Sequence, residues 1–172
     1  MSSTATLDEL HTARLRLHRM RADDEDDLNR MHSDEKVMAT LGGVRSAQQT
    51  ANFLIGAMAH WLHYGFGLWM VYDVRSGRFA GRGGLHHIMV EGQDEIEVAY
   101  AFMSDFWHQG LATELAAESV RIAFDVLELS NLVCFTLPTN RGSRRVMEKV
   151  GFVYERDITH ANLPHVLYRL TK

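Results

Sequence analysis

The second half of the chain alternates strand-like and helix-like segments, and this alternation limits the folds that it can adopt. A strand predicted over Glu95–Met103 precedes a helix over Gly110–Leu127 and an apolar, fully buried strand over Leu132–Leu137. A second helix runs from about Arg141 to Val150, and Gly151 suits a left-handed cap at its end. This order indicates a sheet with helices packed against it.

The first half adds further strands and one sharply delimited helix. Ser46 and Gln49 have the spacing of a capping box, in which each residue satisfies the backbone amide of the other. Apolar residues then recur at helical spacing until Gly65: Phe53, Leu54, Ala57, Met58, Trp61 and Leu62. The other predicted strands are Arg14–Met20, Leu68–Val74, Arg78–Val90, Val153–Arg156 and His165–Leu170. The fold class is therefore mixed α/β, or α+β.

Length and composition exclude several classes of protein. The 172 residues predict one domain, which we place at residues 11–172 behind a flexible tail at 1–10. The single cysteine, Cys134, forms no internal disulfide, which favours a reducing, cytoplasmic compartment. The sequence has neither a signal peptide pattern nor the roughly 20 apolar residues of a membrane span. A net charge of −4 disfavours nucleic acid, so we expect a small-molecule or cationic partner.

Two clusters raise the hypothesis of a metal site. Asp23–Asp27 is acidic, but carboxylates are favoured at a helix N-terminus and are usually solvated there. His60 and His63 share a helix face with no carboxylate at matching spacing, which favours surface or packing roles. We therefore expect no metal.

The sharpest candidate site lies where a strand passes into a strong helix. Gly110 and Ala112 let a ligand approach the backbone closely, and the first-turn amides of the helix attract anions such as a pyrophosphate. Asn140 stands at a second strand-to-helix junction. It either caps the helix or points its amide at a ligand beside the Glu95–Met103 strand.

Three motifs, in order and at family spacing, resemble the GNAT N-acetyltransferases, and within them the ribosomal-protein N-acetyltransferase (Rim-type) branch. Residues 12–17 (TARLRL) are similar to an opening T-x-R-L-x-L strand. Residues 97–114 contain EVAY and FWHQGLATE, similar to E-I-G-Y and Y-W-G-K-G-Y-A-T-E. Residues 140–152 (NRGSRRVMEKVGF) are similar to N-x-x-S-x-x-V-L-E-K-L-G-F. The resemblance covers nearly the whole chain.

The resemblance implies a twisted, mostly antiparallel mixed sheet flanked by helices, with a central splayed strand pair. It implies an enzyme that uses acetyl-CoA as co-substrate, with the pantetheine arm along Phe102 and Met103 as an extra strand. Asn140 and Ser143 would hold the arm from the other side. The pyrophosphate would bind the amides of His108, Gln109, Gly110, Leu111, Ala112 and Thr113. A primary amine, on a protein N-terminus or a small molecule, would attack the thioester directly in a ternary complex.

A base helps such an amine to lose its proton, and Glu97 is our candidate. It lies on the strand that precedes the proposed pyrophosphate loop. The alternative is a strand-face carboxylate paired with a cation. Asp105 and His108 are the next candidates. Cys134 lies mid-strand without an activating neighbour, which disfavours an acyl-enzyme.

Two departures from the family pattern keep a second function open. His108 stands where the loop usually has glycine, and Met147 stands where many members have the tyrosine that protonates the leaving thiolate. A non-catalytic domain that senses CoA or acyl-CoA is therefore the alternative. Tyr100 and Tyr168 are candidates for protonating the thiolate or positioning substrate, or else pack as aromatic residues.

The identity of the acceptor does not follow from the sequence. Glu91, Asp94, Glu95 and Glu97 would favour a cation, although a solvated hairpin tip explains the first three equally well. We expect a monomer or homodimer that binds neither nucleic acid nor membrane.

Overall fold

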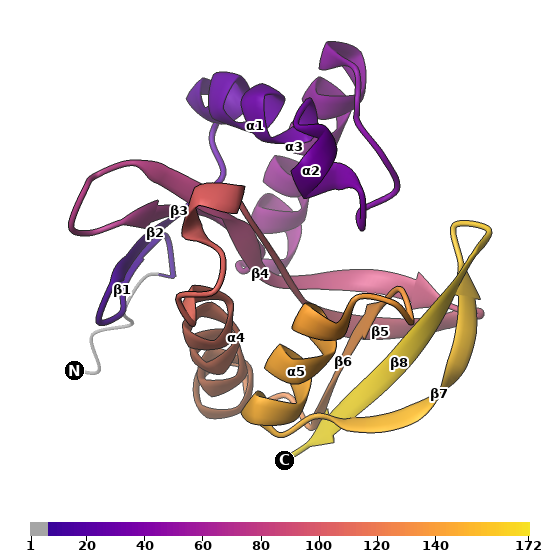
Figure 1. Ribbon diagram of the computed structural model, residues 1–172. Coiled ribbons are helices and arrows are strands. Elements are labelled where there is room, and N and C mark those ends of the chain that lie inside the picture. Colours follow the sequence, from indigo (N-terminus) through magenta and orange to yellow (C-terminus); the bar gives the residue numbers. More distant parts are fainter. Residues whose placement is uncertain (1–6) are drawn as a thin grey trace, which may run out of the picture. The chain divides into compact units, whose positions relative to one another are not determined.

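The computed structural model describes residues 7–172 (Figure 1). These residues form two compact units. The first unit runs up to Gly83 and includes Ala101–Trp107, and the second contains Gly84–Tyr100 and His108–Lys172. The single domain over 11–172 stays a prediction.

Eight strands are hydrogen bonded in the order β1-β2-β3-β4-β5-β6-β8-β7. Their bounds are β1 (Glu9–His11), β2 (Leu15–Arg19), β3 (Leu68–Asp73), β4 (Phe79–Val90), β5 (Gln93–Phe102), β6 (Asn131–Thr136), β7 (Val153–His160) and β8 (Leu163–Thr171). The pairs β1–β2, β2–β3, β6–β8 and β7–β8 are antiparallel, whereas β5 and β6 are parallel. The predicted mixed, mostly antiparallel sheet is confirmed.

The parallel pair β5–β6 is in register at one position, Glu97 opposite Val133. Its neighbour pair β6–β8 is in register from Asn131 to Thr136 along the full length of β6. The short β5–β6 register corresponds to the splayed central pair that the family resemblance implies. Glu97 lies where these two strands meet.

The predicted tail at residues 1–10 is only partly described. Residues 1–6 lie outside the described residues, but Glu9 and Leu10 belong to β1 and pair with β2. Three residues are too few for sequence alternation to identify a strand. The ladder to β2 therefore orders a segment that the sequence assigns to the tail.

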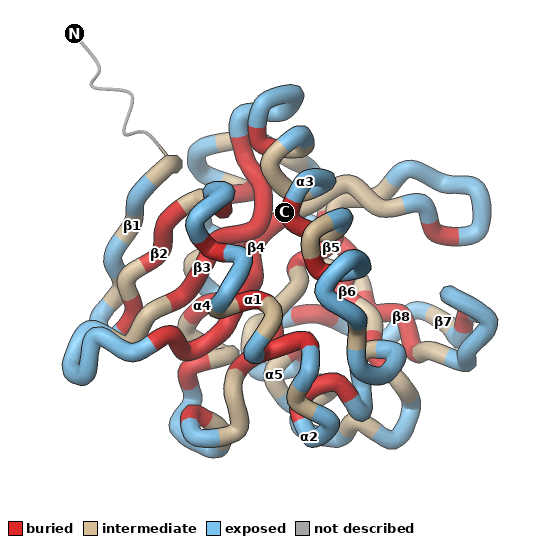
Figure 2. Tube along the Cα trace, turned by 90° about the horizontal axis from the view of Figure 1, so that it is seen from above, coloured by how far each residue is buried: buried red, intermediate tan, exposed pale blue. Residues whose placement is uncertain are grey.

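Three helices belong to the first unit: α1 (Glu25–His32), α2 (Glu35–Met38) and α3 (Ala47–Tyr64). Burial is concentrated on β2 and β3 of this unit, coloured red in Figure 2, where Leu15, Leu17 and Trp69 have no exposed surface. The capping box that begins α3 is confirmed, because Ser46 Oγ accepts from the Gln49 amide at 3.2 Å and Gln49 returns the bond at 2.8 Å. Leu62 continues the apolar spacing of this helix but is 78% exposed.

The same unit encloses a buried imidazole. His32 Nδ1 lies 3.0 Å from Thr50 Oγ1, and its Nε2 accepts from Arg82 Nε at 3.1 Å. Burial, together with the charges of Arg82 and Arg45, lowers the pKa of His32 to about 3. The ring is therefore neutral at physiological pH and accepts from the buried Arg82.

The second unit contains α4 (Leu111–Arg121) and α5 (Arg141–Val150), which lie side by side (Figure 1). The sequence predicts one helix from Gly110 to Leu127, but α4 gives way at Ile122–Val126 to a π-helical turn. The predicted cap of α5 is confirmed, because Gly151 has a φ of 108° and its amide bonds back to the helix.

The acidic segment and the α3 histidines have structural partners. Asp24 accepts from the Arg21 amide at 2.6 Å and lies 3.6 Å from His18, and His60 Nδ1 lies 2.9 Å from the Phe66 carbonyl. Among residues 7–172, no group of three or more His, Cys, Asp or Glu is arranged to hold a metal. No described helix is long and apolar enough to cross a membrane.

Candidate active site

The start of α4 differs from the starts of the other long helices. Ser46 caps α3 and Asn140 caps α5 through their side chains, but α4 begins at Gly110 with no side-chain cap. Gly110 has a φ of 78°, in the left-handed region that suits glycine. The first-turn amides of a helix lack intrahelical partners and carry the positive end of its dipole. This helix start therefore has the chemistry of an anion site and fits a pyrophosphate.

His108 shares the left-handed conformation of Gly110, with a φ of 59°. A side chain is strained there, which explains why a glycine suits this position of the loop. The side chain of His108 is exposed, so its bulk is directed outside the core. The loop therefore takes a left-handed conformation at a residue other than glycine.

The proposed pantetheine strand, Phe102 and Met103, lies in the first unit. The Met103 amide already donates to the Ala80 carbonyl at 2.8 Å, and the Phe102 carbonyl accepts from Trp107 Nε1 at 2.8 Å. Successive amides of a strand point to opposite edges, so the Phe102 amide points away from Ala80. The pantetheine arm is expected to follow Phe102 and Met103. Of their two amides, that of Phe102 is the one that points away from β4.

The residue beside Ala101 and Phe102 must be a glycine, Gly81. A Cβ at Gly81 would overlap the carbonyl oxygen of Ala101 and press on Phe102 Cα. Close backbone packing against the end of β5 therefore explains the glycine at position 81.

Asn140 and Ser143 lie in the second unit at the start of α5. Asn140 Oδ1 accepts from the Ser143 amide at 3.2 Å, while Asn140 Nδ2 donates to Thr136 Oγ1 at 3.0 Å. Both ends of the Asn140 amide are therefore engaged within the protein, as the capping alternative predicts. Ser143 Oγ and its carbonyl each lie 3.0 Å from the Tyr100 hydroxyl.

The buried Cys134 and the half-buried Tyr100 form a pair next to Ser143. Cys134 Sγ lies 4.0 Å from the Tyr100 hydroxyl, and burial raises the pKa of both groups well above their usual values. The thiol is therefore protonated and a poor nucleophile, which agrees with the expectation that Cys134 forms no acyl-enzyme. Met147, at the position of the family tyrosine, is 1% exposed.

Glu97 is buried and bonded to an imidazole. Its Oε2 lies 2.6 Å from His86 Nε2, and the Glu97 side chain is 11% exposed whereas that of His86 is 28% exposed. The alternative role of Glu97, a strand-face carboxylate paired with a cation, therefore has a candidate partner in His86, which is cationic only when it is protonated. The residue type of His86 does not identify it in the sequence as the partner of Glu97. Its position does identify it, because His86 and Glu97 lie equally far from the hairpin turn between Val90 and Gln93.

The other candidate bases have different surroundings. Asp105 forms an exposed ion pair with Arg78 at 2.6 Å, and His108 lies on the loop described above. Tyr168 is buried. Its hydroxyl donates to Glu148 at 3.1 Å and accepts from Arg144 at 3.1 Å, so it is engaged within the protein.

The acidic hairpin is neutralised within the protein. Its carboxylates pair with basic side chains, namely Glu91 with Arg156 at 3.1 Å, Asp94 with His87 at 3.0 Å and Glu95 with Arg169 at 2.7 Å. Glu97 alone of the four lies buried at the β5–β6 junction. The first three therefore give little support to a cationic acceptor.

Comparison with known proteins decides the family. The acetyltransferase (GNAT) domain matches residues 14–153, which include β2, α4, α5 and the loop between β5 and α4. This chain belongs to the GNAT acetyltransferase family. As a GNAT acetyltransferase it transfers an acetyl group from acetyl-CoA to an amine, and this agrees with the function and cofactor that the motifs predict.

Two relatives span most of this GNAT chain. The chain is 30% identical to the uncharacterized protein YkkB of Bacillus subtilis, covering 93% of this chain and 94% of the relative. It is 29% identical to the FsC-acetyl coenzyme A-N(2)-transacetylase of Aspergillus fumigatus, covering 84% of this chain and 65% of that protein.

Solved structures share the GNAT fold. An acetyltransferase from Agrobacterium tumefaciens has a TM-score of 0.83 at 23% identity, covering 95% of this chain and 94% of that one. The ribosomal-protein-S5-alanine acetyltransferase of Vibrio fischeri has a TM-score of 0.77 at 16% identity, covering 95% and 96%. At these identities the likeness concerns the fold, and the Rim-type branch stays a prediction.

Proposed function

We propose that this acetyltransferase acts on a primary amine of a protein N-terminus or small molecule, by direct attack in a ternary complex. The uncapped start of α4, with Gly110 in the left-handed region, is the observation that carries the donor assignment. The amides of His108 to Thr113 would hold the pyrophosphate, and Phe102, Met103, Asn140 and Ser143 would flank the pantetheine arm. Acetyl-CoA supplies the activated acetyl thioester.

Glu97 provides the negative charge that promotes loss of the amine proton. Amine pKa values are about 7.7–8.0 for an α-amine and about 10.4 for a lysine-like amine, so most acceptors begin as ammonium ions near neutral pH. A buried carboxylate at the β5–β6 junction favours removal of that proton, directly or through a partner. The buried Cys134 thiol also suits a reducing, cytoplasmic compartment.

The donor site is tested with Gly110→Glu and acetyl-CoA binding by isothermal titration. The added carboxylate would occupy and repel the pyrophosphate position, so we expect binding to be lost. Gly56→Glu on α3 is the control, because its Cβ would meet nothing within 4 Å and the charge change is the same. Unchanged affinity in a folded Gly110→Glu protein would refute the donor site.

The reaction is tested by release of the CoA thiol with a panel of amines, and products are identified by mass spectrometry. We expect acetylation of at least one class of amine. The second candidate, a CoA-sensing domain, rests on His108 in a strained conformation and on the buried Met147 in place of the family tyrosine. Tight acetyl-CoA binding without thiol release for any amine would favour the sensor.

A further inference from the structure

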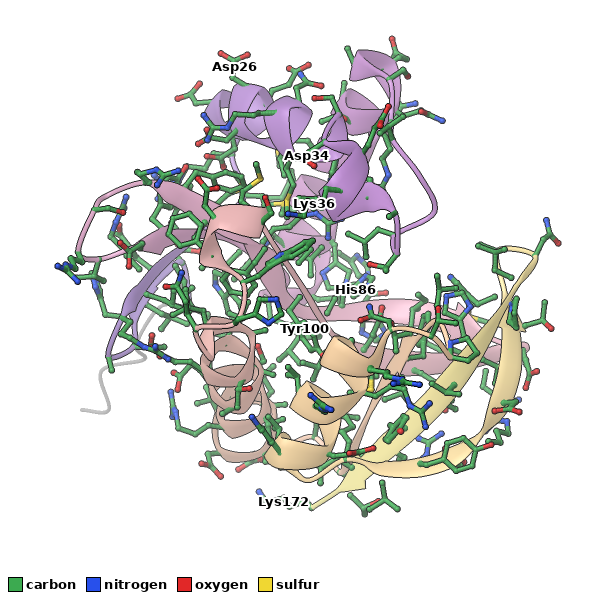
Figure 3. The ribbon with its side chains drawn as sticks, in the orientation of Figure 1. Asp26, Asp34, Lys36, His86, Tyr100 and Lys172 are labelled. Carbon is green, nitrogen blue, oxygen red and sulfur yellow. The ribbon has the colours of Figure 1, made fainter. Side chains whose placement is uncertain are left out.

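One half-buried imidazole in the second unit, that of His86, lacks a role in the function proposed above. His86 on β4 and Glu97 on β5 come from the two strands of one hairpin, and Figure 3 labels His86 together with Tyr100 of the same unit. The carboxylate is nearly covered, at 11% exposure, whereas the ring is 28% exposed. The imidazole is thus the more accessible member of the pair.

The hydrogen bond to Glu97 determines which nitrogen of the neutral His86 ring carries the proton. An ionised carboxylate only accepts, so the 2.6 Å contact requires the proton of the neutral imidazole to be on Nε2. The lone pair is then on Nδ1. No described residue forms a hydrogen bond with Nδ1, and the exposed surface of the ring allows an approaching amine to reach it. A buried carboxylate behind an imidazole is the arrangement that holds a histidine base in its active tautomer.

We propose that His86 Nδ1 takes the proton of the acceptor amine and that Glu97 is the positioning residue behind it. This rests on the proposed function and replaces direct proton removal by Glu97. The amine nitrogen bonds to the acetyl carbonyl carbon as the carbon–sulfur bond breaks, and that electron pair leaves with the sulfur of CoA. The amine proton goes to Nδ1, which gives an imidazolium beside the Glu97 carboxylate and later releases the proton to solvent.

Other titratable and charged groups face the pair from the elements packed against it. Along the same face of β5, Glu95 is held by Arg169 at 2.7 Å. Tyr100 and Cys134 lie near Glu97, and burial raises the pKa of each, so both stay neutral through this range. The rings of His160 and His165 pack on Phe135, which belongs to the apolar cluster of this unit, and they are not part of the His86–Glu97 pair.

The chain offers a matched control. His87, the next residue of β4, also lies against a carboxylate, with Nδ1 3.0 Å from Asp94 Oδ1 and a side-chain exposure of 26%. Its carboxylate partner is 61% exposed, so the pair is on the surface. His86→Gln and His87→Gln therefore make the same chemical change. The amide introduced by His86→Gln keeps a donor for Glu97 and limits any loss of stability.

The first measurement needs neither donor nor acceptor. Nitrogen-15 NMR of the imidazoles identifies the tautomer of each neutral ring. We expect His86 to carry its proton on Nε2, and Glu97→Gln to weaken this preference. A neutral His86 protonated on Nδ1 would overturn the proposal, because that ring has no basic nitrogen toward the acceptor.

The second measurement is the pH profile of kcat, at saturating acetyl-CoA and amine, for acetylation of a peptide α-amine and of a polyamine. We expect an ascending limb that stays at the same pH for both amines, since it reports the enzyme. His86→Gln should lower kcat about 10²–10⁴-fold and lose that limb, and added imidazole should restore part of the rate. His87→Gln should retain both rate and limb.

The outcomes separate this inference from the proposed function. If His86→Gln keeps the rate and profile of His87→Gln while Glu97→Gln is impaired, His86 is not the base and acetyl transfer still stands. If the unmodified protein binds acetyl-CoA but acetylates no amine, the proposed function fails and this inference fails with it.

Discussion

Replacing His108 with glycine should stabilise the protein. His108 has a φ of 59°, and a left-handed conformation costs a residue with a side chain about 1–2 kcal/mol relative to glycine. Glycine also makes the unfolded chain more flexible, which offsets about 0.4–1 kcal/mol. Because the His108 side chain is exposed, its removal costs little packing. With the middle of each range, the net gain in free energy of unfolding is about 0.8 kcal/mol, or about 2–3 °C in Tm for a chain of this size.

Thermal and urea unfolding of His108→Gly and His108→Ala test this reasoning. Alanine removes the ring but keeps the strain, so His108→Ala should be no more stable than the unmodified protein. The decisive result is a higher stability of His108→Gly than of His108→Ala. If His108→Gly unfolds at or below the temperature of His108→Ala, the loop is not strained at this residue and the explanation of its departure from the family motif is wrong.

Three further outcomes are expected. Asn140→Ala should lower the free energy of unfolding by about 0.5–2 kcal/mol through loss of the cap on the Ser143 amide; if capping is its only role, acetyl-CoA affinity measured by titration stays unchanged. Met147→Tyr should cost about 1–3 kcal/mol in chemical denaturation, because the site is buried, and a large gain in turnover instead would show that thiolate protonation limits the reaction. The free energy of unfolding should fall as pH is lowered from about 6.5 toward 3, by up to about 1.4 kcal/mol per pH unit, because the unfolded His32 binds a proton that the folded one, with its pKa near 3, does not. His32→Gln should flatten that slope in urea titrations at several pH values.

Local signals in the sequence predict those elements whose causes are local. The Ser46–Gln49 box and Gly65 bound α3 as expected, because a cap involves residues a few positions apart. Gly151 ends α5 for the same kind of reason. Leu62 continues the apolar spacing of α3 but is exposed, since the spacing identifies an apolar face without saying how far along the helix it is covered.

Features that depend on distant pairing are not readable in the same way. The strand at Glu9–His11 exists through its ladder with β2, and the π-helical turn after Arg121 replaces a helix that the sequence continues to Leu127. The local geometry around the candidate residues follows the same division. Gly110 is identified by its neighbours in the chain, whereas the partner of Glu97 is identified only when β4 and β5 are aligned across their turn.

The uncapped start of α4 has a kinetic consequence. Backbone amides that hold a pyrophosphate make the same contacts with acetyl-CoA before the reaction and with CoA after it. Binding energy shared by substrate and product tightens both complexes and leaves the barrier between them unchanged. Such an enzyme is inhibited by its own product, and its flux follows the ratio of acetyl-CoA to CoA in the surroundings. If the start of α4 holds the pyrophosphate as proposed, discrimination between acetyl-CoA and CoA must arise at the acetyl end of the donor, far from this helix.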